Sequence, residues 1–163
     1  MLNQPILVLK KGTENLQGKE EIISNIEACL AIVEIIRTTL GPRGMDKMII
    51  GDNGTTISND GATIIKLLNI EHPAAKSLAD VAKSQDNEIG DGTTSVMIFA
   101  GELLKEAKQF IEDGMSPQII INGYWRALQF AIKKLEECAI TINDKSEEEK
   151  RNLLLFVDSF HLL

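Results

Sequence analysis

Residues 88–96 read EIGDGTTSV, which places an aspartate between two glycines and follows it with two threonines and a serine. A similar stretch, SNDGATIIK, occupies residues 58–66 and opens another apolar run. In each stretch an Asp stands just before an expected helix, where its carboxylate can accept first-turn N–H hydrogen bonds, worth about 1 kcal/mol. From these residues alone, the two stretches are either two capped helices or two walls of one site.

The composition is that of one globular domain. The chain has 163 residues, 44% of them hydrophobic and 25% charged, which is enough for a single core. The formal net charge of −7 argues against a nucleic-acid binder, because phosphate contacts need a basic face. The sequence has no basic amphipathic stripe, no membrane-spanning run and no leader pattern, so we expect a cytosolic protein. Cys29 and Cys138 lack CxxC spacing and are expected to be reduced core residues.

Apolar periodicity predicts a mostly α protein. Residues 19–40 carry one apolar helical face, which Gly41 and Pro42 terminate. Further helices are predicted at 60–70, 72–90, 93–114 and 116–142, with Pro73 and Pro117 in first turns and Ser116 as a cap. The predicted core face of the helix after Gly92 consists of Val96, Phe99, Leu103, Ala107 and Phe110.

Two other segments are predicted to be extended. Residues 47–60, KMIIGDNGTTISND, have apolar residues around a turn sequence and predict a β-hairpin. Residues 5–12, PILVLKKG, predict an N-terminal strand or arm, although a frayed terminus is equally consistent with them. A last segment is expected from about residue 146.

The two Asp-Gly motifs also fit an anion site. A helix N-terminus offers unpaired N–H groups and a partial positive charge that suit phosphate, while Gly90 and Gly92 allow close backbone approach. Asp91 would repel phosphate unless Mg²⁺ lay between them, because that ion takes a carboxylate together with phosphate oxygens. No G-x-x-x-x-G-K-[ST] motif occurs, which excludes a P-loop ATPase. Residues 38–47, TTLGPRGMDK, are either a helix stop or a third wall for a flat ligand.

The same stretches carry a resemblance to a known family. TTLGPRGMDKMI, TISNDGATIIKLL and HPAAKSLADVAKSQDNEIGDGTTSV, in this order and spacing, resemble a group II chaperonin, the family of the eukaryotic cytosolic TCP-1 ring complex. PILVLKKGT and GMSPQIIINGYWRA are similar to it as well, so the resemblance runs from residue 5 to about residue 155. It implies a mostly α fold, the N-terminal half of a chaperonin equatorial-domain helical bundle with a small β-hairpin and an N-terminal strand. Residues 1–163 would be a partial ATP-binding equatorial domain without the intermediate and apical domains.

The resemblance also implies a site. Asp91 would bind Mg²⁺, and Asp60 would be the catalytic-site acid near the γ-phosphate that helps to position the attacking water or its ions. The residues implied in binding ATP are Leu40, Gly41, Pro42, Gly61, Gly92, Thr93, Thr94 and Ser95.

As a function, the resemblance implies an ATP-dependent chaperone subunit. It would join other chaperonin subunits in a hetero-oligomeric double ring and fold unfolded cytosolic clients such as actin and tubulin, with no nucleic-acid or membrane partner. The family's general base comes from the missing intermediate domain, and the end LLLFVDSFHLL departs from the family pattern, so no nucleotide contact is assigned to Ser159. The alternatives are a truncated, non-catalytic fragment that keeps subunit contacts without hydrolysing ATP, and a helical adaptor whose helices are merely capped.

Overall fold

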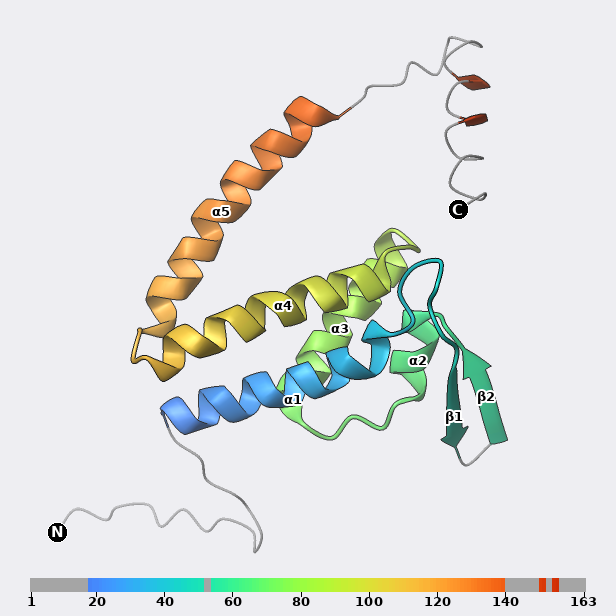
Figure 1. Cartoon of the computed structure of the whole chain (residues 1–163), viewed down its shortest axis with the longest axis horizontal. Helices are drawn as coiled ribbons and strands as arrows, with labels where there is room; N and C mark the ends of the chain where they lie inside the picture. Colours follow the sequence, from blue (N-terminus) through green and yellow to red (C-terminus); the bar gives the residue numbers. More distant parts are fainter. Residues whose placement is uncertain (1–17, 52–53, 140–149, 152–153, 156–163) are drawn as a thin grey trace, which may run out of the picture.

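The computed structural model describes residues 18–51, 54–139, 150–151 and 154–155. The predicted arm at 5–12, Ser159 and most of the segment predicted from residue 146 lie outside these residues. The described elements follow one another along the chain (Figure 1). They are α1 (Lys19–Arg37), β1 (Lys47–Gly51), β2 (Gly54–Ser58), α2 (Gly61–Leu67), α3 (Pro73–Glu88), α4 (Thr93–Glu112) and α5 (Pro117–Cys138). The predicted mostly α fold with a small hairpin is confirmed.

The core lies where α1, α3 and α4 pack together, with α2 closing one end. Val33, Ile36, Ile64 and Met97 are its largest fully buried side chains; burying a side chain of this kind stabilises a fold by about 1.5–3 kcal/mol. The predicted core face of α1 is confirmed from Ile26 to Ile36, but Leu40 lies beyond the helix and is exposed.

The predicted core face of α4 is wrong by about a quarter of a turn. Phe99 is 67% exposed and Phe110 47% exposed, and of the predicted face only Ala107 is buried. Two apolar stripes run along this helix. The stripe that contains Gly101 packs on Val33 of α1, because glycine allows the two helices to approach closely. The buried side of α4 consists of Thr93, Met97, Gly101, Ala107 and Ile111.

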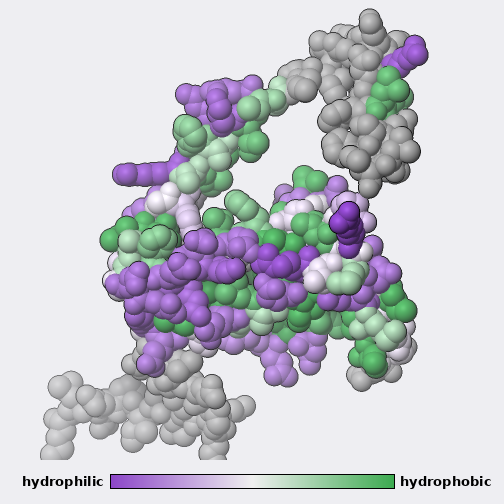
Figure 2. Space-filling model, in the orientation of Figure 1, coloured by the Kyte–Doolittle hydropathy of each residue, from purple (hydrophilic) through white to green (hydrophobic). Residues whose placement is uncertain are grey.

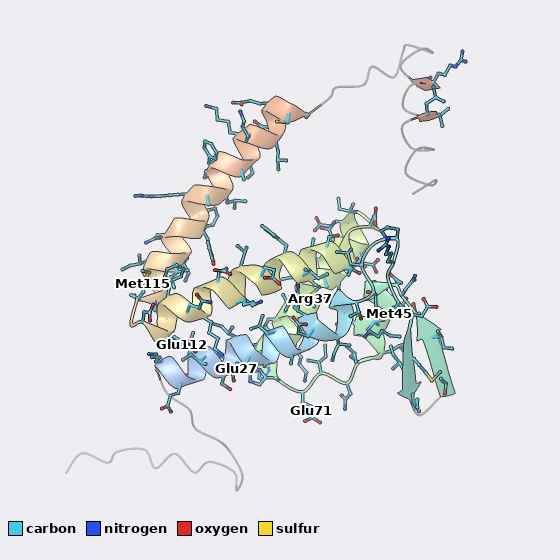
Figure 3. All side chains as sticks on the ribbon, viewed as in Figure 1. Glu27, Arg37, Met45, Glu71, Glu112 and Met115 are labelled. Atoms are coloured by element: carbon cyan, nitrogen blue, oxygen red, sulfur yellow. The ribbon has the colours of Figure 1, made fainter. Side chains whose placement is uncertain are left out.

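Charged side chains bridge α1 and α4 along the rim of this contact (Figure 3). Lys108 Nζ lies 2.7 Å from Glu27 Oε1, and Arg37 pairs with Glu102 and lowers the pKa of that carboxyl by hydrogen bonding to it. Partly exposed pairs of this kind contribute little to stability, because water and salt screen them. The buried residues, rather than the ion pairs, therefore hold the two helices together.

The predicted hairpin is confirmed and leads directly into α2. β1 and β2 are antiparallel, with Lys47 opposite Ser58 and Gly51 opposite Gly54. Pro73 stands in the first turn of α3, as predicted, and the His72 side chain caps that helix by accepting from Ala74 N at 3.3 Å.

The last described helix, α5, diverges from the rest of the bundle (Figure 1). Tyr124 Oη donates to Leu103 O of α4 at 2.7 Å, yet no residue of α5 is buried. Pro117 opens the helix as predicted, but Ser116 makes no side-chain capping bond. Cys138 is exposed, so its prediction as a core residue is wrong, whereas Cys29 is buried. An apolar stripe on α5 is exposed (Figure 2) and comprises Ile121, Trp125, Leu128, Ile132 and Leu135.

None of the helices in the described part of the chain combines the length and apolar character that a bilayer crossing requires.

Candidate functional site

A small cavity of about 140 Å³ forms where three chain junctions meet. One junction is the turn after α1, the second is the start of α2, and the third is the turn from α3 into α4. The sequence had singled out every residue of the lining, which consists of Leu40, Asp60, Gly90, Asp91, Gly92, Thr93, Thr94 and Ser95. The fold thus brings the two Asp-Gly motifs and the helix-stop motif to one place.

The start of α4 is left open toward this cavity. Its N-cap is Gly92, in the left-handed conformation with φ 76° and ψ 9°, and it has no side chain to accept a first-turn hydrogen bond. The helical bonds begin with Val96 N, which donates to Gly92 O at 2.9 Å. Because the first N–H groups of a helix have no partner within it, those of the first turn of α4 remain available as donors. α1 and α5 also lack side-chain caps, but neither start lines this cavity.

Asp91 is not the cap of α4, since it lies one residue before Gly92. Its Oδ1 accepts from Gly92 N at 2.7 Å, and its side chain is exposed at the cavity wall. The interpretation of this aspartate as a helix cap is therefore wrong. Asp91 lines the cavity without capping the helix.

Asp60 does cap a helix, so for this motif the simpler interpretation is confirmed. Its Oδ2 accepts from Thr63 N at 3.0 Å and from Thr63 Oγ1 at 2.6 Å. The hydrogen bond from the Thr63 hydroxyl lowers the pKa of the Asp60 carboxyl below its ordinary range. The group therefore stays ionised at neutral pH and presents a negative charge at the lining of the cavity.

Of the turn after α1, only Leu40 enters the lining; Gly41 and Pro42 do not. Gly41 adopts φ +85°, and its carbonyl accepts from Gly44 N at 2.9 Å, so it closes the turn that presents Leu40. Thr39 anchors the same turn, because its hydroxyl donates to Ile36 O at 2.8 Å.

Gly61 also lies outside the lining and acts through packing. It is buried, and a Cβ built on it would stand 2.3 Å from Thr94 Oγ1. The missing side chain lets the start of α2 approach the start of α4, which sets the spacing of the two walls.

The sequence analysis missed Gln85. Its Nε2 donates to Asp91 O at 2.9 Å, which fixes the turn between α3 and α4. Its signal is weak, because a glutamine near the end of a helix has the pattern of any solvated residue.

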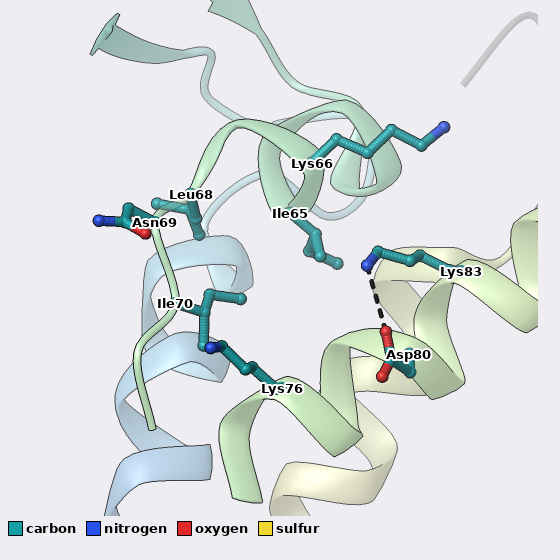
Figure 4. Close-up of a pocket in the computed structure, with 8 residues that line it drawn as sticks. All are labelled: Ile65, Lys66, Leu68, Asn69, Ile70, Lys76, Asp80 and Lys83. Atoms are coloured by element: carbon teal, nitrogen blue, oxygen red, sulfur yellow. Dashed lines mark hydrogen bonds and ion pairs between the residues drawn. The ribbon is translucent and has the colours of Figure 1, made fainter. Parts of the chain in front are cut away.

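A second hollow, of about 440 Å³, lies on the other side of α2. Figure 4 shows its lysines, Lys66, Lys76 and Lys83, with Asp80. Lys83 is paired with Asp80 at 3.1 Å and Lys66 with Asp86 at 3.0 Å, so most of the positive charge is already neutralised. No glycine lines it, and it is a poorer candidate for phosphate.

In the part of the chain that the structure describes, the smaller cavity offers too few protein ligands for a metal ion bound by protein alone, but it has enough for Mg²⁺ bound together with phosphate. Among the described residues, no group of three or more His, Cys, Asp or Glu side chains could hold a metal ion. Mg²⁺ typically takes one or two carboxylates, phosphate oxygens and several waters. Asp91 Oδ1 is used by Gly92 N, which leaves its second oxygen for such an ion.

Comparison with known proteins assigns the family. A sequence profile for the TCP-1/cpn60 chaperonin family matches residues 32–157. The chain belongs to that family. The match includes all three junctions of the cavity, and it confirms the chaperonin resemblance of the motifs.

Individual chaperonin subunits agree with this assignment. T-complex protein 1 subunit eta of Tetrahymena pyriformis is 61% identical over 155 residues, which is 95% of this chain and 28% of the relative. The proteins of the same name from Arabidopsis thaliana and Homo sapiens are 58% and 54% identical over 94% of this chain. Within the chaperonin family, these three relatives are all eta subunits. The chain spans 28% of the length of these chaperonin relatives.

Proposed function

We propose that residues 1–163 form the N-terminal part of a chaperonin equatorial domain and bind ATP with Mg²⁺ in the cavity at the start of α4. The observation that carries this proposal is the open start of α4, where a glycine N-cap leaves first-turn N–H groups without a side-chain acceptor. These groups share a cavity with the Asp60 and Asp91 carboxylates. Donors for an anion and acceptors for a cation on facing walls suit a metal–phosphate ligand.

Each residue of the first turn of α4 has a role in this proposal. Gly92 lets the phosphates approach the backbone, while Thr93, Thr94 and Ser95 offer N–H and hydroxyl donors together with the positive end of the helix dipole. Leu40, in the turn closed by Gly41 and Pro42, would contact the non-phosphate part of the nucleotide.

The two aspartates, Asp91 and Asp60, would have different roles. Asp91 would hold Mg²⁺, which when bound bridges phosphate oxygens and offsets their charge. Asp60, placed beside Gly61 on the facing wall, would orient a water or ion near the terminal phosphate. No residue here takes the role of general base, so we do not expect this chain alone to hydrolyse ATP.

The size of the cavity limits what it holds. At about 140 Å³ it is smaller than the roughly 300–1,000 Å³ of a typical small-molecule site. It fits the phosphates and the ion, and the base and ribose would extend outside it. Affinity should therefore depend chiefly on the phosphate chain.

The wider role follows from the family. We propose that the chain acts as part of an ATP-dependent chaperone subunit in the cytosol, with other subunits in a hetero-oligomeric double ring. That ring would couple ATP hydrolysis to the folding of proteins such as actin and tubulin.

The second candidate is a non-catalytic interaction fragment. The exposed apolar residues of α4 and α5, Phe99 and Trp125 among them, favour it, because a large exposed apolar patch favours association. Such a fragment would keep subunit contacts without a working nucleotide site.

Calorimetric titration with ATP, with and without Mg²⁺, separates the two. We expect Mg²⁺-dependent binding that weakens about tenfold or more in Asp91→Asn, since one charged contact contributes about 1.5–3 kcal/mol. Asp113→Asn, at the far end of α4, is the matched control and should bind like the wild type. Unchanged binding in Asp91→Asn would exclude the metal role, and a folded wild-type chain that binds no ATP would favour the interaction fragment.

A further inference from the structure

Gln85, in the last turn of α3, holds both ends of the turn that leads to α4. Its main-chain oxygen accepts from Ile89 N at 3.0 Å and from Gly90 N at 3.4 Å. Its side-chain Nε2 donates to Asp91 O at 2.9 Å. A half-buried side chain that bonds the far end of the turn restrains the backbone on which the Asp91 carboxylate stands.

The hydrogen bond from Gln85 Nε2 to Asp91 O fixes the direction of the Asp91–Gly92 peptide group. In a planar trans peptide the C=O and the following N–H point in opposite directions. With Asp91 O directed at Gln85, Gly92 N–H points away from Gln85 and toward Asp91 Oδ1, at 2.7 Å. Asp91 and Gly92 both line the cavity, so the direction of this peptide decides whether Gly92 N–H can hold the Asp91 carboxylate in place there.

This peptide needs a restraint because glycines flank Asp91. Gly90 has φ +80° and Gly92 φ +76°, and glycine populates both signs of φ at little cost. Turns with glycine in such positions can exchange between forms that differ by a flip of one peptide. The flipped form would turn the Asp91 carbonyl oxygen toward the cavity, where it would repel phosphate.

The end of α3 that carries Gln85 is held to α2 by an ion pair. The carboxylate of Asp86, the residue after Gln85, accepts from Lys66 Nζ of α2 at 3.0 Å. Asp60, the N-cap of α2, also lines the cavity.

We infer that Gln85 is a positioning residue that locks the Asp91–Gly92 peptide with its carbonyl held by Gln85 and its N–H on the Asp91 carboxylate, so that this carboxylate is fixed for the metal of the bound nucleotide. The inference rests on the proposed nucleotide site and adds to it a residue outside the lining.

The test replaces the amide without changing its length. Gln85→Met keeps the size of the side chain and removes the donor, and the exposed Asn87→Ala on the same helix end is the control. We expect Gln85→Met to weaken ATP–Mg²⁺ binding about tenfold, the effect of one lost hydrogen bond, with an unchanged unfolding temperature. The Gly92 amide resonance should broaden in the ligand-free variant, since the peptide now exchanges between two orientations.

Gln85→Glu provides a second variant of the same length. Its ionised carboxylate cannot donate to Asp91 O and would face that carbonyl oxygen, so at pH 7 this variant should bind ATP–Mg²⁺ at least as weakly as Gln85→Met.

The outcomes separate the two proposals. The positioning role is overturned if the wild-type chain binds ATP–Mg²⁺ and Gln85→Met binds it with the same affinity, or if the Gly92 resonance does not change. Either result leaves the proposed nucleotide site standing. A folded wild-type chain that binds no ATP–Mg²⁺ would overturn the proposed site and the role of Gln85 together.

Discussion

Gly101 of α4 lies directly against Val33 of α1, so close that a Cβ on Gly101 would stand 2.7 Å from Val33 Cγ1 and 2.8 Å from Cγ2. Both residues are buried. The contact sets the distance between the two helices that carry most of the core, and α4 in turn presents the open helix start at the cavity.

Gly101→Ala should therefore destabilise the fold. Overpacking a buried contact costs about 1–3 kcal/mol, which outweighs the gain of up to about 1 kcal/mol that alanine brings over glycine in a helix. The free energy of unfolding from urea titration is the measurement. Gly123→Ala in α5 is the control, because nothing lies within 4 Å of its Cβ position, and it should not lower stability. A Val33→Ala/Gly101→Ala variant no more stable than expected from the two single changes would contradict the contact.

Gly61→Ala should impair both the site and the fold. Its Cβ would meet the Thr94 hydroxyl at 2.3 Å and Thr94 Cβ and main-chain N at 3.3 Å, so rotation of the hydroxyl alone does not relieve the contact and the starts of α2 and α4 must move apart. We expect ATP–Mg²⁺ affinity to fall about tenfold and the unfolding temperature to fall with it. A loss of stability without a loss of affinity would show instead that Gly61 serves packing alone.

Thr63→Ala should raise the pKa of Asp60 toward its ordinary value, because the Thr63 hydroxyl is the main cause of its lowering. A lowered folded pKa stabilises the protein above the unfolded value, about 3.9, and this contribution disappears as the pH falls through the folded pKa. The stability difference between wild type and variant should thus be present at pH 7 and shrink in acid. Titration of the Asp60 carboxyl by NMR gives the pKa directly; an unchanged value would refute the assignment.

The two cysteines should differ in reactivity. Cys138 is exposed, whereas Cys29 is buried and burial raises the pKa of its thiol. A thiol reagent should modify Cys138 quickly in the native protein and reach Cys29 only after unfolding, because the thiolate is the reactive form. Mass spectrometry after limited labelling identifies the modified residue. Equal labelling of both in the native state would contradict the packing of α1.

Much of the fold could be predicted because its signals are local. The prolines and glycines marked the helix ends, and the turn sequence between apolar residues in 47–60 marked the hairpin. The buried face of α4 could not be predicted, since Phe99 and Met97 lie on two apolar stripes of one helix. Periodicity detects a stripe, but only the fit of Gly101 against Val33 decides which stripe is buried.

The candidate site shows the same division. Its lining could be predicted because two similar motifs marked helix starts and a glycine-proline turn marked a helix end, and the fold brings these helix ends together. The different roles of Asp60 and Asp91 could not be predicted. A shift of one residue in the start of the helix decides whether the aspartate is the N-cap, as Asp60 is, or precedes the N-cap, as Asp91 does. The part played by Gln85 depends on a bond to a main-chain carbonyl, which no side-chain pattern encodes.

The lining of the cavity comes entirely from residues between 40 and 95, and this bears on how the protein is made. A growing polypeptide leaves the ribosome with its N-terminal part first, and that part can fold before the rest exists. Every wall of the cavity is therefore translated before α5 begins. Once α4 has emerged far enough to pack on α1, all three junctions that form the cavity can meet without α5.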